Sequence, residues 1–186
     1  MKLTILKTWL SSRARKVPVT TIVLHGTAGT TVAGSLSWLR QIGLSYHYVI
    51  DRDGSVTKAV PTGRVAYHAG VSSGPNGKNV NDYSIGIAFA NKEDGKEAIT
   101  IPQIDAARLL VKELTSADKN IKWLTRHKDV SPGRKSDPKM MDDGTLRFTA
   151  SFSGISAWVY GGTQIPTGRL SHLIAVACPL SELSYC

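Results

Sequence analysis

Apolar and aromatic residues of this chain gather in four short runs, separated by polar and glycine-rich segments. The runs cover residues 20–25, 46–51, 83–90 and 121–125. Runs of this length that are rich in β-branched residues are typical of buried strands. Arg52, Asp53 and Gly54 follow the second run and precede residues 55–60, and an Asp-Gly pair between two such runs predicts a hairpin turn.

Two other stretches show the spacing of helices. Residues 34–41 predict a short helix that stops near Gly43. Pro102 opens a longer amphipathic helix that ends near Ala117, with apolar residues at 3.6-residue spacing: Ile104, Ala107, Leu110, Val111 and Leu114. The alternation of strands and helices predicts an α/β fold, with one domain built on a central mixed β-sheet flanked by helices.

Two regions carry a weaker signal. Residues 63–82 are rich in Gly, Ser, Pro and Asn, and they predict a long loop that lines a substrate site. Residues 140–150 predict a turn, and the short apolar pieces at 154–160 and 170–176 fit either a helix or a strand. We therefore place the domain at residues 20–186 and treat residues 140–186 as its poorly defined C-terminal part.

Length and composition fit one soluble globular domain. A chain of 186 residues buries roughly 70% of the surface that its unfolded form exposes. No apolar run approaches the roughly 18 residues of a membrane-spanning helix. The net charge is +9, and residues 139–186 hold three Lys/Arg and three Asp/Glu, so the positive excess lies in residues 1–138. Such an excess suits nucleic acid, an anionic membrane or an anionic wall polymer equally well.

The two ends of the chain add little chemistry. Residues 1–19 carry five cationic side chains and no acid, and Lys7 interrupts their only apolar stretch, so they predict a basic arm and not a secretory signal. Without an export signal, we expect the protein in the cytoplasm. Cys178 and Cys186 are the only cysteines, and they predict reduced thiols with no disulfide framework.

The stretch 126–138 is the densest in reactive side chains. It holds His127, Asp129 and Asp137 together with four cationic residues, and Pro132 and Pro138 prevent it from forming an uninterrupted helix. A second histidine, at position 25, ends a predicted strand, which is where open α/β sheets place their ligands.

These residues can supply a metal site. A mononuclear hydrolytic zinc site takes three protein ligands and leaves one position open. His25, His127 and Asp137 can form that set, and His47 and Asp129 are competing candidates. Spacing alone fits equally well with two hydrogen-bonded histidines at strand ends and a solvated aspartate.

Five ordered blocks between about residues 20 and 140 together carry a specific resemblance. The blocks are residues 23–28, 45–54, 67–70, 81–87 and 126–138. As a set they resemble the zinc-dependent N-acetylmuramoyl-L-alanine amidases of the type 2 family, which includes phage endolysins, bacterial recycling amidases and animal peptidoglycan recognition proteins. The pattern is most similar to the phage endolysins of the lysozyme type.

The resemblance implies a role for each residue of the site. His25, His127 and Asp137 fall on the three positions that bind Zn²⁺, which leaves Cys178 and Cys186 without a metal role. Lys135 falls on a catalytic lysine or threonine position, Tyr46 on a catalytic tyrosine, and His68 on a histidine that contacts substrate.

The neighbouring residues are expected to have structural roles. Because side chains alternate along a strand, Tyr46 and His47 point to opposite faces, and His47 is expected to support the sheet. Asp129 is expected to be a structural carboxylate. Arg126, Lys128 and Arg134 are expected to be surface cations.

One residue departs from the family pattern. Recycling amidases carry a glutamate two residues after the glycine of the Ser-Ile-Gly-Ile block, and this chain has Ala88 there. The expectation is a site without a carboxylate base, which favours a phage endolysin.

The expected activity is zinc-dependent cleavage of the amide bond between N-acetylmuramic acid and L-alanine. We expect a monomer that acts on cell-wall peptidoglycan, binds no nucleic acid, crosses no membrane, and stays in the host cytoplasm until its release to the wall. A non-catalytic peptidoglycan-binding module and a cytosolic recycling amidase for anhydro-muropeptides are the alternatives. Contact with host RNA polymerase, which one phage branch inhibits, is left open.

Overall fold

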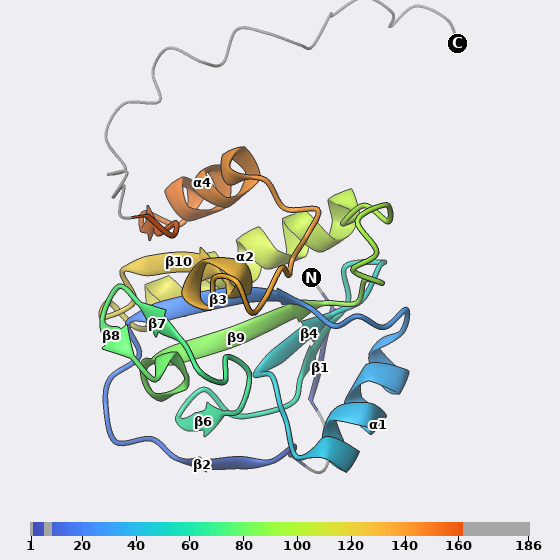
Figure 1. Cartoon of the computed structure of the whole chain (residues 1–186), viewed down its shortest axis with the longest axis horizontal. Coiled ribbons are helices and arrows are strands. Elements are labelled where there is room, and N and C mark those ends of the chain that lie inside the picture. The colour runs from blue at the N-terminus through green and yellow to red at the C-terminus, as the bar shows by residue number, and fades with distance from the viewer. Residues whose placement is uncertain (1, 6–8, 162–186) are drawn as a thin grey trace, which may run out of the picture.

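A seven-stranded mixed sheet forms the centre of the protein in a computed structural model that describes residues 2–5 and 9–161 (Figure 1). Its strand order is β1-β5-β4-β9-β3-β10-β11. In chain order, its strands are β1 (Leu3–Ile5), β3 (Thr21–Gly26), β4 (Tyr48–Ile50), β5 (Val56–Lys58), β9 (Ser84–Phe89), β10 (Trp123–Arg126) and β11 (Ser156–Ala157). Only β4 and β5 pair antiparallel among these neighbours, as the hairpin that the Asp-Gly turn predicts.

Two small antiparallel sheets and five helical segments complete the described part of the chain. One small sheet pairs β2 (Ser12–Ala14) with β6 (Arg64–Ala66), and the other pairs β7 (Ser73–Gly74) with β8 (Gly77–Lys78). The helical segments are α1 (Val32–Ile42), the 3-10 turn η1 (Val80–Tyr83), α2 (Ile101–Ala117), α3 (His127–Val130) and α4 (Asp143–Phe152).

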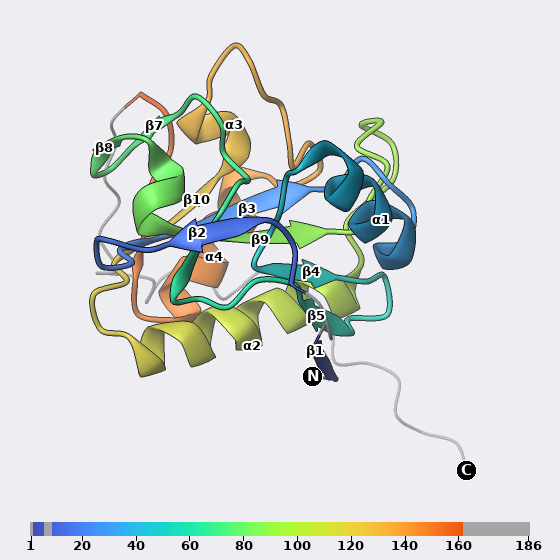
Figure 2. The same ribbon diagram turned by 90° about the horizontal axis from the view of Figure 1, so that it is seen from below.

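The two faces of the large sheet are covered differently. Ile22 and Leu24 of β3 belong to the main core, which includes Leu110 of α2 and Leu146 of α4. Figure 2 shows α2 along one side of the sheet, with α1 and α3 on the opposite side. Because side chains alternate along a strand, His25 points away from the α2 side, toward the face that carries α3.

Local signals set the ends of the two predicted helices. The Thr31 side chain accepts from the backbone N–H of Gly34 at the start of α1, and Gly43 ends the helix with φ of 71°. Thr100 and Gln103 form a reciprocal capping box at the start of α2. The predicted α/β fold, with its mixed sheet flanked by helices, is confirmed.

Several segments hold more regular structure than their sequences indicate. The region 63–82 contains β6, β7, β8 and η1 and is not a plain loop. The expected N-terminal arm contributes β1 and β2 to two sheets. Residues 140–160 form α4 and β11, where the sequence predicts only a turn and an undefined apolar piece.

Other sequence expectations lie outside the described residues. These are the apolar piece at 170–176 and the thiols of Cys178 and Cys186. Within the described residues, no helix has the length and apolar character that crossing a membrane requires.

Candidate functional site

The site lies at the carboxyl ends of two adjacent parallel strands. Arg126 of β10 pairs with Leu24 of β3, so the residues that follow, His127 and His25, lie side by side. Their ring centroids are 4.4 Å apart. Asp137 arrives from the loop after α3, and its carbonyl oxygen accepts from the backbone N–H of Lys128 at 2.9 Å. Sheet register and loop closure therefore bring together the three predicted metal ligands.

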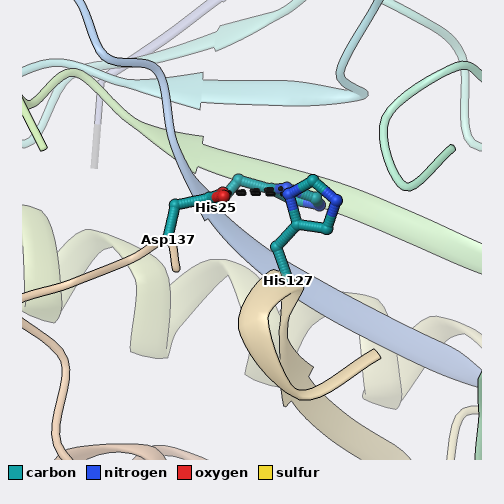
Figure 3. Close-up of side chains that lie close together, drawn as sticks. All are labelled: His25, His127 and Asp137. Atoms are coloured by element: carbon teal, nitrogen blue, oxygen red, sulfur yellow. Dashed lines mark hydrogen bonds and ion pairs between the residues drawn. The ribbon is translucent and has the colours of Figure 1, made fainter. Parts of the chain in front are cut away.

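One atom from each of these residues points to a common centre (Figure 3). Oδ2 of Asp137 lies 3.1 Å from Nδ1 of His127 and 3.5 Å from Nδ1 of His25. One ligand atom from each residue lies within 4.8 Å of the other two. We refer to His25, His127 and Asp137 as the ligand triad.

Hydrogen bonds fix the protonation of His25. The hydroxyl of Ser84 donates to the carbonyl of Val80 at 2.6 Å, so its oxygen accepts from Nε2 of His68 at 3.1 Å. Nδ1 of His68 must then accept from Nε2–H of His25, at 3.0 Å. This series of hydrogen bonds leaves Nδ1 of His25 without a proton. The atom is buried and has no hydrogen-bond partner among the described residues.

The same reasoning applies to His127. Its Nε2 lies 3.2 Å from the carbonyl oxygen of Ala69 and donates to it, which leaves Nδ1 as an acceptor. Nδ1 nevertheless faces the carboxylate of Asp137, and two acceptors at 3.1 Å repel each other unless a cation lies between them. The ligand triad therefore fits a bound metal ion, and two imidazole nitrogens with one carboxylate oxygen suit zinc.

The titration behaviour of the triad agrees with this arrangement. Burial, and secondarily the positive charge that His127 can carry, lower the pKa of His25 from 6.5 to about 4. Burial alone would raise the pKa of Asp137, but its close contacts with the imidazole rings of His127 and His25 outweigh burial and hold that pKa far below its usual value. At neutral pH His25 is neutral and Asp137 is ionised, which is the state that metal binding requires.

A cavity of about 450 Å³ opens beside the triad. Tyr46, His68, Glu93 and Lys135 are among the residues that line it. The Tyr46 ring lies 5.0 Å from the His25 ring, and burial raises the pKa of its hydroxyl, so this phenol keeps its proton. Lys135 is exposed at the rim. Tyr46 and Lys135, both predicted to be catalytic, therefore lie at the same cavity.

His68 also lines this cavity, but its ring nitrogens are bonded to other residues. It is 7% exposed, and both of its ring nitrogens are engaged, one by His25 and the other by Ser84. Its contacts support His25. A contact between His68 and substrate stays a prediction.

Two residues that compete as metal ligands lie outside the triad. Nδ1 of His47 accepts from the backbone N–H of Gly86 at 2.9 Å, and its Nε2 lies 3.0 Å from the carbonyl oxygen of Arg64. Asp129 accepts from Arg126 at 2.6 and 3.2 Å. The prediction that Arg126 is a surface cation is wrong, because this side chain is 1% exposed and pairs with Asp129 in the interior.

Sequence reasoning missed Glu93. Ala88 supplies no carboxylate, as expected, yet the cavity contains one because Glu93 reaches it from the segment after β9. The cavity therefore contains a carboxylate that the sequence does not indicate, and the absence of a carboxylate base stays a prediction. Residues 92–97 show no periodicity, and the sequence identifies them only as a charged turn, so no signal marks Glu93 beforehand.

Comparison with known families agrees with this geometry. The family model for N-acetylmuramoyl-L-alanine amidase matches residues 15–140. The chain belongs to this amidase family. The match covers all five sequence blocks that carry the resemblance and all three residues of the triad, so the family predicted from the sequence is confirmed.

Individual relatives in the amidase family include amidases named for anhydro-muramyl compounds and an endolysin. The 1,6-anhydro-N-acetylmuramyl-L-alanine amidase AmpD of Escherichia coli (strain K12) is 34% identical over 101 residues, and the match spans about half (54%) of each protein. AmiD of E. coli, solved with the substrate anhydro-N-acetylmuramic acid-L-Ala-D-gamma-Glu-L-Lys, superimposes with a TM-score of 0.61 at 25% identity, covering 70% of this chain and 57% of AmiD. An endolysin amidase of Clostridium intestinale URNW superimposes with a TM-score of 0.60 at 26% identity, covering 74% of this chain and 86% of the endolysin.

Proposed function

We propose that this protein is a zinc-dependent hydrolase that cleaves the amide bond between N-acetylmuramic acid and L-alanine in peptidoglycan. The observation that carries the proposal is the ligand triad, in which two unprotonated imidazole nitrogens face one carboxylate oxygen beside an open cavity. Membership of the amidase family supplies the reaction class.

Three protein atoms would hold the ion. They are Nδ1 of His25, Nδ1 of His127 and Oδ2 of Asp137. Bound zinc supplies Lewis acidity, which polarises a carbonyl group and makes water more acidic. The remaining side of the triad faces the cavity, where a substrate amide has access to it.

Two side chains at the cavity have roles in this proposal. Lys135 donates from its ammonium group to the negative charge that develops on the amide oxygen, and donors of this kind contribute about 10²–10³ in rate. Tyr46 keeps its phenolic proton at neutral pH and orients the attacking water by hydrogen bonding. His68 keeps the proton of His25 on Nε2, away from the metal.

The proposal includes two possible substrates, polymeric peptidoglycan and soluble anhydro-muropeptides. A phage endolysin degrades polymeric peptidoglycan after its release from the host cytoplasm, and the net charge of +9 is compatible with binding to an anionic wall polymer. A cytosolic recycling amidase prefers soluble anhydro-muropeptides, and the similarity to AmpD supports that alternative. Ala88 no longer favours the endolysin, because Glu93 brings a carboxylate to the cavity.

Mass spectrometry of the reaction products tests the proposal. Purified sacculi and a soluble anhydro-muropeptide are each incubated with the protein, with and without a chelator. We expect free peptides that begin with L-alanine, loss of release with the chelator, and recovery on addition of zinc. Release from sacculi supports the endolysin, and release from the soluble substrate alone supports the recycling amidase. No release from either substrate with stoichiometric zinc would leave only a non-catalytic binding module.

A further inference from the structure

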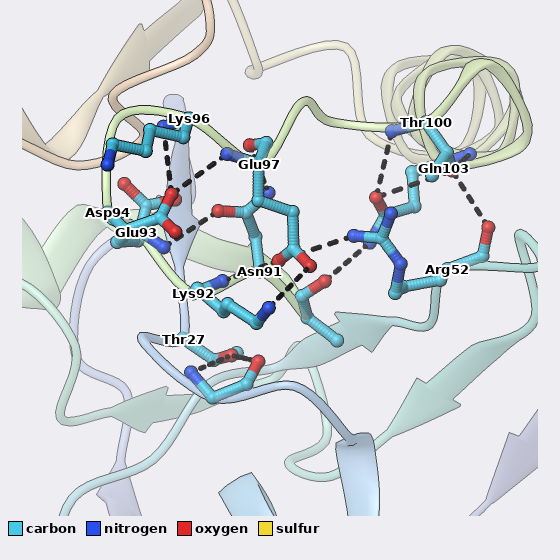
Figure 4. Close-up of polar contacts among 12 residues, drawn as sticks. Thr27, Arg52, Asn91, Lys92, Glu93, Asp94, Lys96, Glu97, Thr100 and Gln103 are labelled. Atoms are coloured by element: carbon cyan, nitrogen blue, oxygen red, sulfur yellow. Dashed lines mark hydrogen bonds and ion pairs between the residues drawn. The ribbon is translucent and has the colours of Figure 1, made fainter.

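The loop at residues 91–97 is held in one conformation by its own side chains (Figure 4). Asn91 accepts from the backbone N–H of Glu93 at 2.8 Å and donates to the carbonyl of Glu97 at 2.9 Å. Asp94 accepts from the backbone N–H groups of Lys96 and Glu97, both at 2.8 Å. These bonds hold Glu93 in the left-handed region, with φ of 58°, which is unfavourable for a residue with a side chain.

This conformation turns the side chain of Glu93 toward the ligand triad. The side chain is nearly buried, and Oε2 accepts from the backbone N–H of Lys139 at 2.7 Å. Oε1 is buried and has no hydrogen-bond partner among the described residues. It lies over Gly26, where an added Cβ would be only 1.8 Å away. The glycine that follows His25 therefore makes room for the carboxylate.

An unpaired carboxylate oxygen in a buried position is unfavourable unless something in the cavity uses it. Burial raises the pKa of Glu93 above that of a solvated glutamate. The left-handed backbone is a second unfavourable feature at the same residue. Such features gather at residues that have a function.

We propose that Glu93 is the general base of the hydrolysis, supplying from the 91–97 loop the carboxylate that Ala88 does not supply from β9. Ala88 pairs with His25 in the sheet, so a longer side chain there would project to the same face as His25. Glu93 reaches that face from outside the sheet. The inference rests on the proposed amidase function.

The proposed step is balanced in atoms and protons. The carboxylate of Glu93 takes one proton from a water molecule in the cavity while the water oxygen bonds to the amide carbon. The carbon–nitrogen bond then breaks, and the proton on Glu93 passes to the leaving nitrogen. The products are the lactyl carboxylic acid and the free amine of L-alanine, and Glu93 returns to its ionised form.

The Glu93→Gln variant tests the step directly. The amide keeps the size of the side chain and an oxygen for the N–H of Lys139, but it cannot take up a proton. On a soluble muropeptide, we expect kcat to fall by about 10²–10⁴-fold, the usual contribution of a general base. KM, zinc content by elemental analysis and the thermal midpoint should match the wild type. Glu113→Gln, an exposed change of the same kind on α2, should behave as wild type in every measurement.

Two results would overturn the inference while the amidase function stands. If the wild type releases product and Glu93→Gln has the same kcat, Glu93 only holds the loop, and Glu93→Ala should then lose stability because it loses the bond to Lys139. If Glu93→Gln loses its zinc, Glu93 is a metal ligand and not a base. A wild type that releases nothing despite full zinc content refutes the amidase function, and the inference fails with it.

Discussion

At the ligand triad, the position of single protons decides whether an ion can bind. His25 and His127 each use Nε2 to donate, to His68 and to Ala69 respectively, so each presents an unprotonated Nδ1 to Asp137. Partners of this kind fix the tautomer of a ligating histidine and are as important as the ligand itself. We therefore expect His68 to affect the binding of an ion without touching it.

Replacement of His68 tests this control. His68→Ala removes the acceptor for Nε2–H of His25, and that proton can then move to Nδ1, where it competes with the metal. We expect zinc affinity to fall by about 10–100-fold, the usual effect of losing such a partner. A competitive chelator titration measures it. His68→Gln, whose amide oxygen can accept the same hydrogen bond, should retain more affinity, and equal affinity of all three proteins would contradict the assignment.

Changes at His127 and Lys135 separate metal binding from turnover. His127→Ala removes a ligand atom, so we expect loss of both bound zinc and wall lysis. Lys135→Ala leaves the triad intact, so zinc should stay while turnover falls by about 10²–10³-fold. Metal analysis and release of peptides from purified peptidoglycan give the two measurements. Lys119→Ala, a change at an exposed lysine, is the control. If Lys135→Ala is as active as the wild type, Lys135 has no part in the mechanism.

The sequence predicts the residues of the triad but not all residues of the cavity. His25 and His127 follow strand-like runs, and Asp137 lies in a loop dense in reactive groups, so general rules for α/β sheets and the family resemblance point to them. Glu93 follows no such rule. Its place depends on side-chain bonds within the 91–97 loop and on the space above Gly26, and neither leaves a pattern in the sequence.

At the scale of elements, a buried ion pair joins the end of β10 to α3 and α4. Nε of Arg126 donates to Asp129 at 2.6 Å, its Nη1 donates to the carbonyl of Met141 at 2.9 Å, and its Nη2 lies 2.6 Å from Asp143. The residue after Arg126 is the ligand His127. This network therefore anchors the turn that presents one ligand of the triad.

Asp129→Ala should be strongly destabilising. It leaves the Arg126 charge buried with Met141 and the half-exposed Asp143 as its remaining partners, and loss of one partner of a buried pair costs about 3–5 kcal/mol. Urea unfolding of the zinc-free protein measures the change. Asp105→Ala is the matched control, because Asp105 is 56% exposed and pairs with Arg108 at the same i,i+3 spacing, and a pair with an exposed carboxylate contributes about 0–1 kcal/mol. Equal losses in the two variants would contradict the role of the buried pair.

Periodicity decides which elements the sequence predicts. The α2 segment repeats apolar residues over more than four turns, so both its existence and its ends are predictable. In the shorter α4 segment, only Leu146, Thr149 and Ala150 are buried. Three buried positions in ten residues do not distinguish a helix from a turn when the surrounding sequence has no pattern.

At the scale of the whole molecule, the α/β class is predictable and the edges of the sheets are not. Alternating strand and helix signals predict a mixed sheet flanked by helices and place its reactive residues at the carboxyl ends of the strands. The pairings of β1 and β2 join Leu3 to Val56 and Ser12 to Ala66. Partners so distant in sequence leave no local signal, and for this reason the N-terminal segment resembles a free arm until the fold is known.

The buried histidines make the stability of the whole protein depend on pH. Burial lowers the pKa of His47 from 6.5 to about 3 and that of His25 to about 4, and it lowers the pKa of His68 well below 6.5. Below pH 6.5 the unfolded chain therefore binds protons that the folded chain does not. The contribution of these residues to stability is fully present above pH 6.5 and is lost as the pH falls toward the folded-state values.

His47→Gln removes the contribution of one of these histidines to the pH dependence of stability, and it does so without changing the ligand triad. We expect the stability of the zinc-free wild type, from urea unfolding between about pH 7 and pH 4.5, to fall more steeply with acid than that of the variant. The difference for one proton approaches about 1.4 kcal/mol per pH unit. Asp and Glu side chains with lowered pKa values titrate below this pH range, so they do not cause the difference between the two stability curves. Parallel curves would mean that His47 binds its proton equally in the folded and unfolded chains, and burial would then not set its pKa.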